Sequence, residues 1–323
     1  MSGIALPRAH APARRWLPFG DRLFRILLAG AAVMVLALLG GAALAIFWGA
    51  LPAFRHFGLA FLTGLAWDPV HRDFGALVPI YGTLVTSTIA MLTAVPVSFG
   101  IALFLTEVAP VWLRAPIGGA IELLAGIPSI IYGMWGLFVF APFMADHVEP
   151  ALTAALGPLP LLGVLFDGPP LGIGMLTGGL ILGVMVVPFI SSVMRDVFRL
   201  VPQALRESAL GLGATRWELV WRVVLPYTKS AVMGGIFLGL GRALGETMAV
   251  TFVLGNAHDF SASLLMPSTS IAAAIANEFT EADSDIYRSS LIALGFVLFA
   301  ITFVVLALAK WLLARLTAGE RAR

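Results

Sequence analysis

The sequence lacks the residues and motifs on which most enzymes depend. It contains no cysteine, which excludes disulfide bonds and thiol chemistry. Its only lysines, Lys229 and Lys310, do not follow a glycine-rich loop, so the chain has no P-loop for ATP. The five histidines form no cluster with carboxylates at metal-ligand spacing, and no serine stands in a G-x-S-x-G turn. We therefore expect no enzymatic activity, and no cofactor or metal bound by this chain.

Charged residues are scarce as well. They make up 12% of the 323 residues, whereas hydrophobic residues make up 59%. This number of charges is too small to cover the surface of a water-soluble domain of this size. We therefore predict an all-α integral membrane protein. Apolar runs of membrane-spanning length occur six times, near 24–51, 77–106, 117–143, 171–194, 229–254 and 287–315. They form one predicted membrane domain, 24–315, between an N-terminal segment, 1–23, and a tail, 316–323.

The positive charges are unevenly placed along this pattern. Of the 20 Lys and Arg residues, 16 lie before or at the start of the first span, in the loop near 107–116, between 195 and 229, or from 310 to the C-terminal end. The positive-inside rule then places both termini and both loops in the cytoplasm. The loops on the other side are acidic; solvated surface explains this most simply, and docking of an external binding protein is the alternative.

The most polar stretch inside the apolar sequence is 207–226, ESALGLGATRWELVWRVVLP. Pro202 suits the first turn of a helix over 203–212, which Gly211 and Gly213 end. Thr215 starts a second helix, and a glutamate three residues later completes a capping box. The pattern predicts a compact helix-turn-helix with positive φ at Gly213.

The fifth predicted span contains two charges roughly in mid-membrane, Arg242 and Glu246. Charges there are costly and mark candidate functional sites, although the i,i+4 spacing also fits a structural ion pair. The same span has two GxxxG pairs, Gly235/Gly239 and Gly241/Gly245, which predict close helix packing.

The second and third spans carry weaker signals of a polar path. Thr86 is one of several hydroxyl residues in the second span, where hydroxyls either hold helices together or line a path. Gly126 and Pro128 predict a break in the third span, directly before Ser129. A broken helix in a membrane is buried in protein or lines a cavity, which makes Ser129 a path candidate.

The stretch 207–226 resembles the coupling loop of ABC-importer permeases, known as the EAA loop. The residues in register with that pattern are Glu207, Ala209, Gly213, Val223, Leu225 and Pro226. Ser208 replaces one alanine, and Val223 stands where isoleucine is commoner. The resemblance implies that this loop docks in a groove of a cytoplasmic ATPase; the alternative is an ordinary amphipathic interfacial loop.

Four further stretches are similar to the phosphate-specific ABC permeases: 74–87, 94–107, 122–136 and 241–256. The opening at Phe74 resembles the C-type subunit of these systems more than its A-type partner. The resemblance implies a type I importer architecture in a bacterial inner membrane. It also implies a second homologous permease, two copies of an ATPase that uses ATP and Mg, and a periplasmic or lipid-anchored phosphate-binding protein. Nucleic acid is not an expected partner.

The residues agree with anion transport. Phosphate crossing a low-dielectric pore needs a compensating positive charge, and the planar fork of arginine matches it. Arg242 is the only Lys or Arg deep in a predicted span, and one hypothesis is that Glu246 holds it aside until substrate arrives. We place Thr86 and Ser129 on the same path. The alternatives are a permease for sulfate or molybdate and an ion-coupled secondary transporter, against which the 207–226 loop argues.

Overall fold

The computed structural model describes residues 18–160 and 162–321, most of which are helical. Contacts divide the chain into two compact units, the residues up to Ala45 and Ile46–Arg323. The α-helices are α1 (Pro18–Phe57), α2 (Ala60–Thr63), α3 (Leu77–Leu103), α4 (Val111–Ala125), α5 (Ser129–Trp135), α6 (Ala141–Phe143), α7 (Glu149–Leu156), α8 (Met175–Arg199), α9 (Gln203–Gly211), α10 (Arg216–Leu219), α11 (Leu225–Leu244), α12 (Met248–Val253), α13 (Ile271–Glu278) and α14 (Asp285–Arg321).

Shorter elements connect these helices. Four π-helical turns and one 3-10 turn are η1 (Phe104–Val108), η2 (Gly136–Phe140), η3 (Met144–Val148), η4 (Gly163–Phe166) and η5 (Val220–Val224). The strands β1 (Trp67–Asp68) and β2 (Asp73–Phe74) pair antiparallel in a small hairpin. Much of the predicted N-terminal segment, including Arg8, Arg14 and Arg15, lies outside the described residues.

Six of the described helices are long and apolar enough to cross a membrane, which confirms the predicted number of spans. They are Gly20–Phe57, Leu77–Val108, Ser129–Leu156, Met175–Arg199, Arg216–Leu244 and Asp285–Arg315. The helix of the last one continues through α14 to Arg321, into the predicted tail.

Two spans differ from the predicted bounds, and the physical causes are local. A break at residues 126–128 makes α4 a separate helix, so the third span runs from Ser129 to Leu156 rather than 117–143. Pro128, which has no N–H to donate, precedes the first residue of the new helix. The fifth span runs from Arg216 to Leu244 rather than 229–254, because η5 carries the helix through Pro226 and Gly245 ends it.

The central helix of the bundle is α8, which packs mainly on α3. The two helices approach closely at two glycines of α8: a Cβ at Gly179 would lie 2.6 Å from the Cβ of Ile89, and one at Gly183 would lie 2.3 Å from Oγ1 of Thr93. The buried apolar side chains of α8 in this core are Met175, Ile181, Leu182, Met185, Val186, Ile190, Met194 and Phe198.

Of the two GxxxG pairs in the fifth span, only the first supports close packing. A Cβ added at Gly239 would lie 2.6 Å from the side chain of Ile190 on α8, and Gly235 faces the same helix. The second pair shows no such close approach, since a Cβ at Gly241 would lie 3.7 Å from the Leu306 side chain on α14 and one at Gly245 would approach only its own helix, the Gly241 carbonyl at 3.6 Å. Gly245 instead ends α11.

The hydroxyls of the second span are used within and between helices, although Thr88 is exposed. Ser98 donates across to the Val187 carbonyl at 3.1 Å, and Thr83 accepts from the Ile271 N–H at 2.9 Å. Five hydroxyls of α3 donate to backbone carbonyls of the preceding turn, those of Thr83, Thr86, Ser87, Thr88 and Thr93. Of the two interpretations of these hydroxyls, this arrangement matches the one in which they hold helices together.

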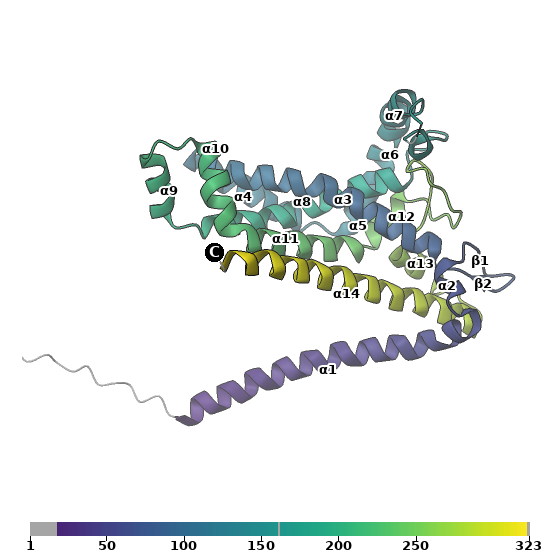
Figure 1. The fold of residues 1–323 in the computed structure, drawn as a ribbon. Coiled ribbons are helices and arrows are strands. Elements are labelled where there is room, and N and C mark those ends of the chain that lie inside the picture. The colour runs from purple at the N-terminus through teal and green to yellow at the C-terminus, as the bar shows by residue number, and fades with distance from the viewer. Residues whose placement is uncertain (1–17, 161, 322–323) are drawn as a thin grey trace, which may run out of the picture. The chain divides into compact units, whose positions relative to one another are not determined.

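The loops collect at two ends of the bundle, as alternating spans require. At one end Arg216 donates to the Glu107 carbonyl, which joins η1 to α10. At the other end the N–H of Leu264 donates to Leu165, and that of Leu176 donates to Leu264, both at 2.8 Å. Figure 1 shows α9 and α10 at the first end, and the hairpin and α13 at the second.

At the second end, one carboxylate contacts three other side chains. Glu278 of α13 accepts hydrogen bonds from the Trp67 indole at 2.6 Å and the Tyr287 hydroxyl at 2.6 Å, and its other oxygen lies 2.7 Å from Nε2 of His258. The imidazole of His258 stacks on Trp67, with ring centroids 5.3 Å apart. Burial, the largest single influence, raises the pKa of Glu278, but its hydrogen bonds with His258, Tyr287 and Trp67 together hold that pKa below the usual value.

Glu278→Gln is expected to lower the free energy of unfolding by about 1–3 kcal/mol at neutral pH, the usual cost of leaving buried partners unsatisfied. A carboxyl with a lowered folded pKa stabilises the fold above its ordinary value of 4.5, and this contribution is lost as the pH falls through the folded pKa. The difference in melting temperature between native and variant protein in detergent should therefore shrink as the pH falls below 4.5. Glu281→Gln, at an exposed neighbour, is the control and should melt as the native protein does at every pH.

Candidate functional site

The stretch 207–226 forms the expected two helices. Gly213, with φ +88°, follows the end of α9, and its N–H donates to the Leu210 carbonyl while the N–H of Ala214 donates to Ala209. These two bonds are those of a Schellman motif, in which glycine supplies the left-handed residue. Thr215 and Glu218 form a reciprocal capping box at the start of α10. The predicted turn, its glycine and its cap are confirmed.

The six residues in register with the EAA pattern divide into two groups. The side chains of Ala209, Val223 and Leu225 pack against the main core and fix the loop to the bundle. Glu207, Gly213 and Pro226 are exposed, as is neighbouring Leu212, whose exposure of 90% is unusual for a leucine. The loop is therefore anchored to the bundle by its apolar side chains, and its outer surface is a mixture of polar and apolar residues.

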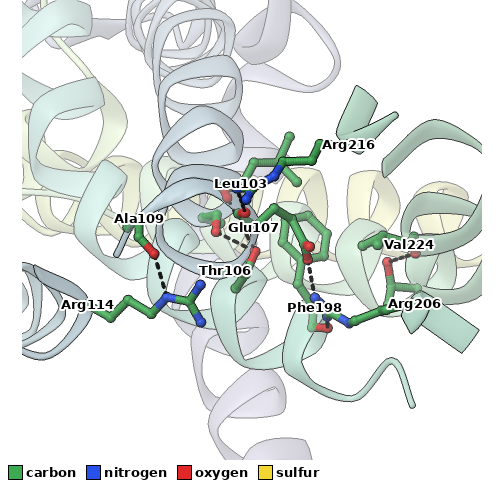
Figure 2. Close-up of polar contacts among 11 residues, drawn as sticks. Leu103, Thr106, Glu107, Ala109, Arg114, Phe198, Arg206, Arg216 and Val224 are labelled. Carbon is green, nitrogen blue, oxygen red and sulfur yellow. Dashed lines mark hydrogen bonds and ion pairs between the residues drawn. The ribbon is translucent and has the colours of Figure 1, made fainter. Parts of the chain in front are cut away.

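A buried ion pair connects this loop to the end of the second span, and the sequence interpretation missed it. Figure 2 shows the Glu107 carboxylate of η1 paired with the Arg206 guanidinium of α9. The Glu107 carbonyl accepts from Arg216 of α10 at 2.8 Å, and Arg206 also donates to the Phe198 carbonyl at the end of α8. Glu107 ends the 94–107 stretch, but no signal along the chain identifies its partners.

In the membrane region, Arg242 occupies the last turn of α11, three residues before the glycine that ends it. Its side chain is exposed in the single chain, and its guanidinium carbon lies 5.8 Å from the centroid of the Phe189 ring on α8. Two helices, α8 and α11, thus lie beside one exposed cation.

Glu246 does not pair with Arg242 among the described residues. The helix ends between them, so Glu246 leaves the face of α11 and its carboxylate accepts from the Ala249 N–H at 3.3 Å at the start of α12. The i,i+4 ion pair considered from the spacing is therefore absent in the described part of the chain. The hypothesis that Glu246 holds Arg242 aside finds no support in this geometry.

The helix break in the third span lies beside the break in the fifth. Ser129 is half-buried and begins the third span. Tyr132 bridges the break by donating to the Leu124 carbonyl at 2.9 Å. Gly133 of α5 would place a Cβ 3.1 Å from the Cα of Ala249 on α12, so the two short helices are in contact. The structure therefore brings the helices carrying Ser129, Arg242 and Glu246 into one region.

Thr86 is not part of this region. Its side chain is 2% exposed in the packed surface of α3, and its hydroxyl donates to the Gly82 carbonyl at 2.7 Å. The hydroxyl is used within its own helix, so a place on a substrate path does not fit it. Tyr132, which sequence reasoning did not select, bridges the break beside Ser129 instead.

Residues 94–318 match the family described as binding-protein-dependent transport system inner membrane component. The chain belongs to this family. The permease is 60% identical over 300 residues to the phosphate transport system permease protein PstC of Xylella fastidiosa (strain 9a5c), covering 93% of this chain and 92% of that protein. It is 57% identical over 298 residues to the protein of the same description from Mesorhizobium japonicum, covering 92% and 91%.

A solved structure shares the fold of the permease. A bacterial ABC transporter involved in the import of the acidic polysaccharide alginate matches with a TM-score of 0.60 and 19% identity, over 92% of this chain and 96% of that chain. The permease is thus a multi-pass membrane protein with the type I ABC importer permease architecture, as the sequence predicted. It is a transport component and not a catalytic subunit.

Proposed function

We propose that this permease is the membrane-spanning subunit of an ATP-driven importer that moves inorganic phosphate into the cytoplasm by alternating access. The observation that carries the proposal is the 60% identity, over nearly the whole chain, to a phosphate transport system permease. The exposed cation of Arg242 on α11, beside Phe189 of α8, supplies a physical reason for anion transport.

Arg242 is the proposed contact for the anion. Arg242 lies within the fifth apolar span, where a cation is costly against lipid, so its exposed face in the single chain is expected to border a partner subunit or an aqueous path. There the guanidinium offers paired donors to phosphate oxygens and offsets their charge. Ser129 at the start of α5 and Glu246 in the break before α12 complete the proposed path, while Thr86 supports the α3 backbone.

The partners follow from the same assignment. A second homologous permease would cover the face that bears Arg242, and one of two copies of a cytoplasmic ATPase would dock on the 207–226 loop. The ATPase, and not this chain, would bind ATP and Mg, since the sequence contains no P-loop. A periplasmic or lipid-anchored phosphate-binding protein would deliver substrate at the end that carries the hairpin and α13.

The test of this function is ATP hydrolysis by the co-purified complex of permeases, ATPase and binding protein. Phosphate is expected to stimulate hydrolysis, whereas sulfate and molybdate are not. Stimulation by sulfate or molybdate but not by phosphate would assign the permease to another oxyanion.

The proposed orientation places both termini and the 207–226 loop in the cytoplasm of a bacterial cell, with this chain in the inner membrane. Val70 in the hairpin and Leu212 in the loop are 86% and 90% exposed, and the chain has no native cysteine. In intact cells without the ATPase, a membrane-impermeant maleimide should label Val70→Cys and not Leu212→Cys. Both should be labelled after permeabilisation, and the reverse pattern in intact cells would overturn the orientation.

A further inference from the structure

We infer that Glu107 is a positioning residue that joins the second span to the coupling loop, so that displacement of the loop by the ATPase moves the second span directly. The inference rests on the proposed function, because it concerns how that loop drives transport. The observation behind it is the contact of Glu107 with both helices of the loop (Figure 2).

The covalent chain connects the loop to two spans only. Residues 200–215 lie between α8 and the helix that begins at Arg216, so a pull on the loop acts through the backbone on the fourth and fifth spans. Glu107 adds the second span, because its carboxylate pairs with Arg206 of α9 and its carbonyl accepts from Arg216 of α10. Arg206 also donates to the Phe198 carbonyl, which fixes the same guanidinium to the end of α8.

Burial distinguishes this ion pair from the other charges of the loop. The side chains of Glu107 and Arg206 are 7% and 18% exposed, on the wall of a cavity of about 630 Å³. By contrast, Arg222 is 78% exposed and lies 3.7 Å from Glu218, four residues earlier on the same helix. Exposed pairs contribute little, whereas loss of one partner from a shielded pair leaves an uncompensated charge. Removal of either Glu107 or Arg206 should therefore disturb this contact more than removal of an exposed partner such as Arg222.

The second span continues this connection to the opposite end of the bundle. It packs along α8 and α11. At its far end Gly82 would place a Cβ 2.0 Å from the Thr269 carbonyl, and Thr83 accepts from the Ile271 N–H. A displacement received at Glu107 is thus carried by packed helices to the segment before α13.

The first test measures phosphate imported per ATP hydrolysed by the complete complex in proteoliposomes. Glu107→Gln and Arg206→Gln should each lower this ratio by about fivefold or more, the lower end of usual coupling between sites, while ATP hydrolysis continues. Arg199→Gln is the matched control, because Arg199 lines the same cavity but pairs only loosely with its neighbour Asp196, at 3.8 Å. An unchanged ratio in both Glu107→Gln and Arg206→Gln would overturn the inference.

A rescue experiment separates positioning from a general loss of folding. The double variant Glu107→Cys/Arg206→Cys, with cysteine-free partners, should be uncoupled until a short bismaleimide joins the two residues. Cross-linking should then restore the ratio to near the native value; uncoupling that persists in fully cross-linked complex would contradict the inference. The native complex separates the proposed function from this inference. If the native protein does not import phosphate, that result counts against the proposed function and not against the role of the Glu107–Arg206 contact.

Discussion

Arg242→Gln is expected to abolish phosphate uptake in a complex that still assembles. Removal of one partner from a desolvated charge pair costs roughly 2 kcal/mol or more, so uptake should fall by at least about 30-fold. Assembly should survive because Arg242 makes no ion pair among the described residues and its side chain is exposed in the single chain. The measurement is phosphate uptake normalised to purified complex.

Two further variants separate the pore role from a structural one. Arg242→Lys should retain part of the activity, since an ammonium keeps the charge but lacks the planar fork. Glu246→Gln should transport well, because a side-chain amide oxygen still accepts the Ala249 N–H that the carboxylate accepts now. Near-native uptake by assembled Arg242→Gln would show that the cation is dispensable.

Gly213→Val is expected to abolish transport while the protein still inserts in the membrane. Gly213 has φ +88°, and no neighbouring atom lies within 4 Å of an added Cβ, so the whole cost is backbone strain. Left-handed backbone costs an L-residue roughly 1–2 kcal/mol, and more when it is β-branched. The Schellman turn should therefore open and the outer surface of the loop should change shape. Co-purification of the ATPase and phosphate uptake are the measurements.

Matched substitutions test this cause. Gly211→Val, two residues away, also has open space around it and an ordinary helical φ, so association with the ATPase should be largely retained. Gly213→Asn should be milder than Gly213→Val, because asparagine tolerates the left-handed region. Equal losses for Gly211→Val and Gly213→Val would attribute the effect to side-chain bulk and not to φ.

The loop was predictable because its signals are local. Pro202, Gly213, Thr215 and Glu218 act on their own turns through missing donors, positive φ and capping hydrogen bonds, and the structure has each in the predicted role. The number of spans was equally accessible, since hydrophobic length is a property of a continuous segment. The boundaries of the spans were less predictable, because a π turn lets a helix continue through Pro226.

The candidate site was predictable only in part. Gly126 and Pro128 predict the break before Ser129. The break after Arg242 was not predicted, because Gly245 was interpreted as part of a GxxxG packing pair and not as the end of a helix. Spacing alone suggested a helix-face ion pair with Glu246, and tertiary packing ended the helix between the two residues.

Contacts between residues far apart in the chain could not be predicted from the sequence. Glu107 and Arg206 are 99 residues apart, and nothing in their neighbourhoods distinguishes them from solvated loop charges. The Trp67, His258 and Glu278 cluster is similar, since its members come from three separate segments. Such contacts depend on which helices become neighbours, and hydropathy does not encode that.

The most direct test of the central claim is uptake of radiolabelled phosphate into proteoliposomes that contain both permeases, the ATPase and the binding protein. We predict uptake that requires ATP on the ATPase side, that unlabelled phosphate competes and sulfate does not, and that Arg242→Gln abolishes. Phosphate uptake driven by an ion gradient without ATP, or no phosphate uptake by a fully assembled complex that hydrolyses ATP, would contradict the account.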